Sequence, residues 1–217
     1  MIVAVIPTRG GSKGVPGKNI FLLNGRPLIH YTLDAAKGSI ADEVWVVSDS
    51  QEILDEAERC QQVKTLKCPD NLTQDNSQVE GTLMYFTENV MYDIMVFIQA
   101  TSPLITYEYI NAGLKKMLSG GYDSVFSAVP TSDILFWNTE EMKPVNYNYD
   151  PKKRERRQTR ISPYVIESGA FYIVKRDVFV KSACRFGGKI GYVEVPFWTY
   201  PQVDSMEDLE NIERLMK

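Results

Sequence analysis

The sequence contains little histidine and little cysteine. Its 217 residues include one histidine, His30, and three cysteines, Cys60, Cys68 and Cys184. A single histidine excludes a histidine-rich metal site and any mechanism that needs several imidazole bases. The cysteines are odd in number and form no C-x-x-C pair, which argues against zinc or dithiol chemistry and fits a reducing compartment. We therefore expect a cytoplasmic protein.

Long apolar segments and an excess of positive charge are also absent. The apolar runs at residues 2–7 and 94–98 are far shorter than the roughly 20 residues that cross a bilayer, and no basic-then-apolar leader is recognised. The formal net charge is -4, whereas non-specific nucleic-acid binding needs a basic surface. We therefore expect neither a membrane nor a secreted protein and no nucleic-acid partner, so any anionic ligand must be bound locally.

The remaining composition, with 44% hydrophobic and 24% charged residues, is that of a globular protein. Short runs of apolar residues predict buried strands at residues 2–6, 44–47, 94–98, 124–129, 170–174 and 192–195. Apolar residues at helical spacing predict helices at residues 51–61, 76–90, 107–118 and 206–216. This alternation predicts an α/β fold with a doubly wound, mostly parallel sheet, in a single domain of residues 1–217.

The alternation stops at residues 133–163. This segment is aromatic at first and ends strongly basic, since residues 152–160 hold six Lys and Arg in nine positions. A charge run of this kind is usually a solvated face, and it also fits a nuclear-import or nucleic-acid patch. We interpret residues 133–163 as an arm inserted into the domain.

The most informative segment is residues 7–19, P-T-R-G-G-S-K-G-V-P-G-K-N, directly after the first predicted strand. It holds four glycines, one arginine and two lysines in thirteen residues. Glycine lets the backbone approach a ligand closely with its N–H groups free, and the cations neutralise anionic charge. The segment therefore predicts a loop that binds a polyphosphate.

Two common phosphate-binding motifs do not fit this loop. A P-loop needs glycine five residues before Gly17, where Ser12 stands, and it needs Ser or Thr where Asn19 stands. A dinucleotide-binding fingerprint needs glycine in place of Arg9. ATPase and dehydrogenase functions are therefore disfavoured.

The same loop resembles a family signature. Residues 6–19 resemble the block of the CMP-sialic acid synthetases (N-acylneuraminate cytidylyltransferases) that is usually written I-[PL]-A-R-x-x-S-K-G-[IL]-x-x-K-N. Residues 98–104 resemble the Q-[PA]-T-S-P block of that family, while residues 156–158 and 167–172 resemble its R-R-Q and E-N-G-x-[FI]-Y blocks. The blocks keep their order over positions 2–204, which is nearly the whole chain.

The resemblance implies a nucleotide-diphospho-sugar transferase fold and a cytidylyltransferase reaction. In that reaction the anomeric hydroxyl of a sialic acid, or of a related nine-carbon α-keto sugar acid, attacks the α-phosphate of CTP and displaces pyrophosphate. Phosphoryl-type transfer needs positioning, cations and Mg²⁺, without a covalent protein intermediate. The implied partners are CTP, the sugar acid and a second copy of the chain, because the 133–163 arm of such a homodimer would cross to the other subunit.

The resemblance also implies which residues form the nucleotide site. The cations that would act on the triphosphate and on the departing pyrophosphate, and so count as catalytic, are Arg9, Lys13 and Lys18. The loop residues that would bind the nucleotide with them are Gly10, Gly11, Ser12 and Asn19.

A second set of residues is implied for the sugar and the metal. Gln99 would contact the sugar, although its block also fits a turn that ends a strand. Arg157 would meet the sugar carboxylate, since a planar guanidinium binds a carboxylate through two hydrogen bonds. Phe171 and Tyr172 would wall the sugar pocket or else belong to the core, and Asp204 would hold Mg²⁺ or else cap the last helix.

Three positions depart from the family pattern. Gln202 replaces the first acid of the usual D-x-D motif, Ser168 replaces a common Asn, and Cys68 replaces an Arg often found near the base. The sequence therefore leaves the choice of sugar open among sialic, legionaminic, pseudaminic, Kdn and Kdo acids, and it leaves the base open as well. A catalytically lapsed nucleotide-binding protein is the alternative from another class.

Overall fold

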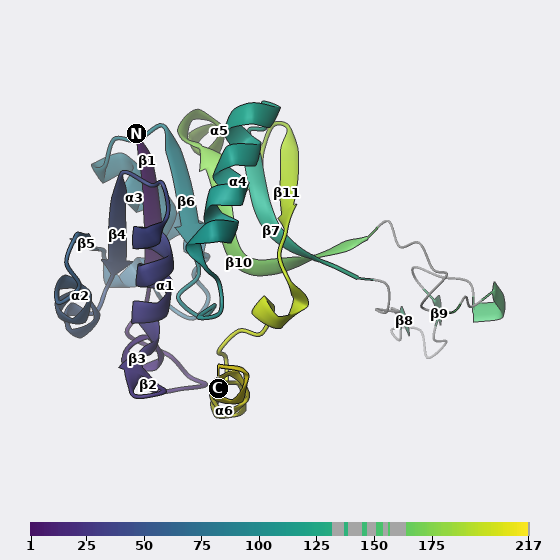
Figure 1. Cartoon of the computed structure of the whole chain (residues 1–217). Coiled ribbons are helices and arrows are strands. Elements are labelled where there is room, and N and C mark those ends of the chain that lie inside the picture. Colours follow the sequence, from purple (N-terminus) through teal and green to yellow (C-terminus); the bar gives the residue numbers. More distant parts are fainter. Residues whose placement is uncertain (132–136, 139–144, 147–150, 154–155, 157–163, 217) are drawn as a thin grey trace.

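The computed structural model describes residues 1–131, 137–138, 145–146, 151–153, 156 and 164–216. Its centre is a seven-stranded sheet with the order β11-β7-β10-β6-β1-β4-β5 (Figure 1). The strands are β1 (Ile2–Thr8), β4 (Glu43–Ser48), β5 (Val63–Lys67), β6 (Ile94–Ile98), β7 (Ser124–Pro130), β10 (Val165–Lys175) and β11 (Ile190–Glu194). In this sheet β10 runs antiparallel to β6 and β7, and the other neighbouring pairs are parallel. The predicted mostly parallel sheet is confirmed.

Helices cover both faces of the sheet, as Figure 1 shows. One face carries α1 (Leu28–Gly38), α2 (Gln51–Glu58) and α4 (Tyr107–Gly120), and the opposite face carries α3 (Val79–Asn89) and α5 (Arg176–Ser182). Successive side chains of a strand point to opposite faces, so Ala4 and Ile6 of β1 pack with the first set while Val3 and Val5 pack with the second. This two-sided burial explains the continuous apolar run that begins the sequence.

The glycine-rich loop after β1 is anchored by a third, smaller core. Val15 of the loop is fully buried and packs with Val203 and with the inner face of α6 (Met206–Leu215). Between this loop and α1 lie a short 3₁₀ helix, Lys18–Ile20, and the paired strands β2 (Leu22–Leu23) and β3 (Arg26–Pro27). The loop is therefore fixed against the C-terminal part of the domain.

The segment 133–163 enters and leaves the domain at one place, because Pro130 of β7 pairs with Val165 of β10. Within it the structure describes β8 (Trp137–Asn138) paired with β9 (Val145–Asn146), and a turn of 3₁₀ helix, Pro151–Lys153. Contact of this arm with a partner subunit stays a prediction.

Two further observations bear on the expectations from composition. In the part of the chain that the structure describes, no helix combines the length and the apolar character that crossing a membrane requires. The three cysteines are free thiols.

Candidate functional site

A groove of about 370 Å³ lies at the carboxyl ends of β1 and β6. Ligands of open α/β sheets bind at this edge. Five of the residues that the sequence predicts for the site line the groove, from segments far apart in the chain: Arg9, Lys18, Asn19, Gln99 and Asp204. We call this cavity the central groove.

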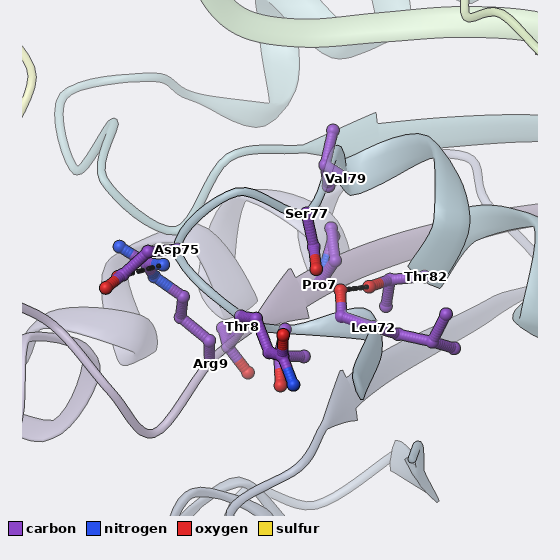
Figure 2. Close-up of a pocket in the computed structure, with 10 residues that line it drawn as sticks. Pro7, Thr8, Arg9, Leu72, Asp75, Ser77, Val79 and Thr82 are labelled. Atoms are coloured by element: carbon purple, nitrogen blue, oxygen red, sulfur yellow. Dashed lines mark hydrogen bonds and ion pairs between the residues drawn. The ribbon is translucent and has the colours of Figure 1, made fainter. Parts of the chain in front are cut away.

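A second cavity, of about 320 Å³, adjoins the central groove, because Arg9 and Val79 line both. Its far wall is the segment 72–77, which joins β5 to α3. Figure 2 shows Asp75 of this segment facing Arg9, and Thr82 of α3 donating a hydrogen bond to the carbonyl of Leu72 over 3.2 Å. We call this cavity the side pocket.

Lys18 is the most enclosed cation of the loop, with 16% of its side chain exposed. Gly17 adopts φ 62°, in the left-handed region that favours glycine, and so starts the 3₁₀ helix that holds Lys18. The Lys18 Nζ donates to the Val203 carbonyl over 3.0 Å and lies 3.1 Å from Asp204 Oδ1. The ammonium is therefore held in place at the groove by the segment that precedes α6.

Arg9 and Lys13 share a single carboxylate. Arg9 Nη1 lies 3.0 Å from Asp75 Oδ1, and Lys13 Nζ lies 2.6 Å from Asp75 Oδ2. The hydrogen bond from Lys13, together with both positive charges, lowers the pKa of Asp75 below its ordinary value. The three predicted catalytic cations are thus each paired with a carboxylate at the edge of a cavity.

Close backbone contacts fix the shape of the loop. A Cβ added to Gly14 would lie 2.1 Å from the carbonyl oxygen of Asp204, so only glycine lets the loop approach that segment. The Asn19 amide donates to the Arg9 carbonyl over 3.0 Å, and Asp49 Oδ1 accepts from the Gly10 N–H over 2.9 Å. Asp49, which directly follows β4, therefore orients the loop.

The other predicted nucleotide-binding residues lie in the same loop. Gly10 and Ser12 are half-buried, and Gly11 is exposed with no atom within 4 Å of the place where a Cβ would stand. In the loop after β6, Gln99 Oε1 accepts a hydrogen bond from Thr101 Oγ1 over 3.4 Å. The Thr101 carbonyl in turn accepts from the Val203 N–H over 2.9 Å, which joins this loop to the segment that holds Lys18.

Asp204 does not cap the last helix. The N-cap of α6 is Ser205, whose side chain accepts from the Asp208 N–H while the Asp208 carboxylate accepts from the Ser205 N–H. This capping box satisfies the helix end. The Asp204 side chain is left 73% exposed at the central groove.

Phe171 belongs to the core rather than to a sugar pocket. Its side chain is completely buried and packs against Gly113 of α4, where an added Cβ would lie 2.9 Å from the ring. Tyr172, the next residue of β10, points to the opposite face because side chains alternate along a strand. Its ring stacks on Phe97, which lines the central groove, at 5.4 Å between centroids. Tyr172 therefore supports the groove from one layer behind.

Arg157, which the sequence predicts to meet the sugar carboxylate, lies outside the described residues.

Arg185 completes this supporting layer, and no sequence motif pointed to it. Its guanidinium lies 4.7 Å from the ring centroid of Tyr172 and 5.0 Å from that of Phe97, and its Nε donates to Glu80 Oε1 over 2.8 Å. Burial raises the pKa of Glu80, but the hydrogen bond and charge of Arg185 outweigh it and leave that pKa below its ordinary value. The ion pair ties the start of α3 to the wall of the groove.

The three departures from the family pattern have distinct places in the structure. Gln202 lines the central groove, and its Nε2 donates to the Ser168 carbonyl over 2.8 Å beside Gly169, which adopts φ 74°. The Ser168 side chain is buried and donates to Ser127 Oγ over 2.6 Å. Cys68 is also buried, and burial is the main reason that its pKa rises to about 11. Of the three, Gln202 is the residue placed to meet a ligand in the groove.

The acidic residues here suit a metal held jointly with a ligand. Among the residues that the structure describes, no three His, Cys, Asp or Glu side chains are grouped so that they could hold a metal ion. Asp204 places an exposed carboxylate at the central groove beside Lys18, and it is the one acidic residue among the described residues that line this groove. One carboxylate completed by substrate phosphates and water is a donor set that Mg²⁺ commonly takes.

In α/β proteins with a mostly parallel sheet, a glycine-rich loop at the carboxyl edge of the sheet is a common binding place for phosphorylated ligands. A sequence profile described as cytidylyltransferase matches residues 3–185. The chain therefore belongs to the cytidylyltransferase family.

Individual relatives agree with this assignment. The N-acylneuraminate cytidylyltransferase A of Danio rerio is 35% identical over 201 residues, which cover 89% of this chain and 46% of that protein. The chain thus spans about half the length of that relative. The pseudaminic acid cytidylyltransferase of Campylobacter jejuni is 26% identical over 225 residues, which cover 99% of this chain and 96% of that protein.

Solved structures confirm the fold. The structure of a CMP:2-keto-3-deoxy-manno-octonic acid synthetase complexed with CTP superposes with a TM-score of 0.77 at 21% identity, covering 99% of this chain and 98% of that one. A 4-diphosphocytidyl-2C-methyl-D-erythritol synthase superposes with a TM-score of 0.71 at 11% identity, covering 100% and 99%. The nucleotide-diphospho-sugar transferase fold expected from the sequence is present.

Proposed function

We propose that this chain transfers CMP from CTP to the anomeric hydroxyl of a sialic acid, or of a related nine-carbon α-keto sugar acid, and releases pyrophosphate. The observation that carries the proposal is the central groove, which brings Arg9 and Lys18 of the loop together with Gln99 and Asp204. Membership of the cytidylyltransferase family and the relatives named above support the same reaction.

The three cations of the loop act on the triphosphate. In the reaction a bond forms between the sugar oxygen and the α-phosphorus, and the sugar hydroxyl loses its proton to solvent water. The bond from the α-phosphorus to the bridging β-phosphate oxygen breaks, and its electron pair leaves with pyrophosphate. Negative charge builds up on the leaving pyrophosphate, and fixed cations stabilise it in the transition state. The positive charges that stabilise the leaving group belong to Lys18, Arg9 and Lys13. The adjoining side pocket provides space for the rest of the nucleotide.

Asp204 would hold Mg²⁺ together with phosphate oxygens, and the ion would supply further charge neutralisation when bound. The Asp204 carboxylate now pairs with Lys18 at 3.1 Å. When the Asp204 carboxylate leaves Lys18, the Lys18 ammonium is free to bind a phosphate oxygen.

The sugar acid would lie in the central groove, with Gln99 as a contact and Arg157 on its carboxylate. A homodimer formed through the 133–163 arm would bring that arginine to the groove of the other subunit. A cytoplasmic location agrees with the free cysteines.

A panel of sugars against nucleotides tests the proposal. The purified chain with Mg²⁺ is expected to release pyrophosphate from CTP in the presence of N-acetylneuraminate, measured with a coupled pyrophosphate assay. Legionaminic, pseudaminic, Kdn and Kdo acids, each with ATP, GTP and UTP as well as CTP, define the specificity. Absence of release from every combination would favour a lapsed nucleotide-binding protein.

A further inference from the structure

Asp75 occupies the position at which the loop cations would meet a phosphate group. Its two carboxylate oxygens are divided between two cations, with Oδ1 at 3.0 Å from Arg9 Nη1 and Oδ2 at 2.6 Å from Lys13 Nζ. Two oxygens of one phosphate group offer the same arrangement of acceptors to the same pair of cations.

Asp75 lies on a different segment of the fold from the residues that are proposed to act in the reaction. It belongs to the segment 72–77, which lines the side pocket, and Figure 2 shows its carboxylate beside the Arg9 guanidinium. Lys18 is paired in a comparable way with Asp204, but Asp204 has a proposed role toward Mg²⁺. Asp75 has no such role in the reaction.

We propose that Asp75 is a specificity-determining residue, an internal anion that competes with the β- and γ-phosphates of the substrate for Arg9 and Lys13. This inference rests on the proposed function of the loop. A nucleotide must displace the Asp75 carboxylate in order to bind both cations. A polyphosphate, with several charges, does so more readily than the weakly charged anions of the surroundings.

The solvent exposure of these three side chains makes it feasible for a nucleotide to displace the Asp75 carboxylate. The side chains of Arg9, Asp75 and Lys13 are 39%, 50% and 81% exposed, and ion pairs at such positions stabilise a protein only weakly. The Asp75 carboxylate therefore returns to the cations as soon as they are vacated. After transfer it competes with the bound pyrophosphate and promotes its release.

The substitution Asp75→Asn tests the proposal, because it removes the charge and keeps the shape. We expect the Kd of pyrophosphate and of CTP, measured by titration calorimetry, to fall about fivefold, which corresponds to the loss of two weak competing ion pairs. Pyrophosphate is expected to become a correspondingly stronger product inhibitor. The Kd of CMP should stay unchanged, because CMP lacks the β- and γ-phosphates.

The matched control is Asp70→Asn. Asp70 begins the 3₁₀ turn Asp70–Leu72 in the same connection and lines neither cavity, so this variant changes the net charge equally without freeing Arg9 or Lys13. Its affinities are expected to match those of the wild type.

Three outcomes overturn the inference. They are an unchanged or weaker affinity of Asp75→Asn for pyrophosphate, an equal tightening in Asp70→Asn, and an equal tightening toward CMP. Failure of the proposed function is a separate result, because it is seen as the absence of pyrophosphate release by the wild-type chain, whereas the tests of Asp75 compare binding affinities between variants. A thermal unfolding scan of each variant verifies that it is folded.

Discussion

Lys18→Ala is expected to lower the rate of pyrophosphate release by about a hundredfold, because one fixed donor to a developing charge is worth roughly 10²–10³ in rate. The Lys18 ammonium is held at the central groove by the Val203 carbonyl and by Asp204, and only 16% of the side chain is exposed. A mobile lysine at the surface cannot replace the Lys18 ammonium, because it is not fixed at the place where the charge develops. The loss should appear mainly in kcat, since the charge on the leaving group develops in the transition state.

Lys37→Ala is the control for this prediction. Lys37 pairs with Asp34 within α1 and lines neither cavity, so its loss alters the net charge equally and should leave the rate at the wild-type value. Lys18→Arg keeps the charge in a different shape and should recover part of the lost rate. A Lys18→Ala enzyme within threefold of the wild type would contradict the assigned role.

Gly14→Ala is expected to lower activity by about a hundredfold, the loss that a displacement of about 1 Å causes in a reacting geometry. The added methyl group would lie 2.1 Å from the Asp204 carbonyl oxygen, and backbone cannot rotate away as a flexible side chain can. The loop must therefore move off the segment that precedes α6, which displaces Lys18 from the Val203 carbonyl that positions it at the groove. The steady-state rate and the Kd of CTP measure the effect.

Gly11→Ala is the matched substitution in the same loop. Nothing lies within 4 Å of the added methyl group, so the loss is expected to be at least about tenfold smaller than for Gly14→Ala. Equal losses would show that any side chain in the loop is harmful and that contact with Asp204 is not the cause. Circular dichroism verifies that both variants keep the fold.

The sequence predicted the parts of the site that depend on buried strands. β1 and β6 are buried on both faces, so their continuous apolar runs placed the residues that follow them, Arg9 and Gln99, at one edge of a parallel sheet. The glycines and cations of the loop then indicated its ligand.

Elements with weaker patterns were not predicted. β5 lies at the edge of the sheet and reads V-K-T-L-K, so it lacks the apolar run of a central strand. α5 has seven residues, too few for a clear helical period. α1 follows the short hairpin β2–β3, which hides its start at Leu28.

Contacts between distant segments were also beyond the sequence. The face to which Phe171 and Tyr172 point depends on the register of β10, and that register follows from its pairing with β6. Asp75 meets Arg9 across 66 positions of the chain, and Arg185 meets Glu80 across 105. Such pairs are set by the packing of the domain, and no local motif records them.

The position of the triphosphate in a crystal grown with CTP tests the central claim most directly. We expect its phosphate oxygens within hydrogen-bond distance of Arg9 and Lys18, along the loop formed by residues 9–19. A nucleotide bound elsewhere in the crystal, with this loop free of phosphate, would contradict the account.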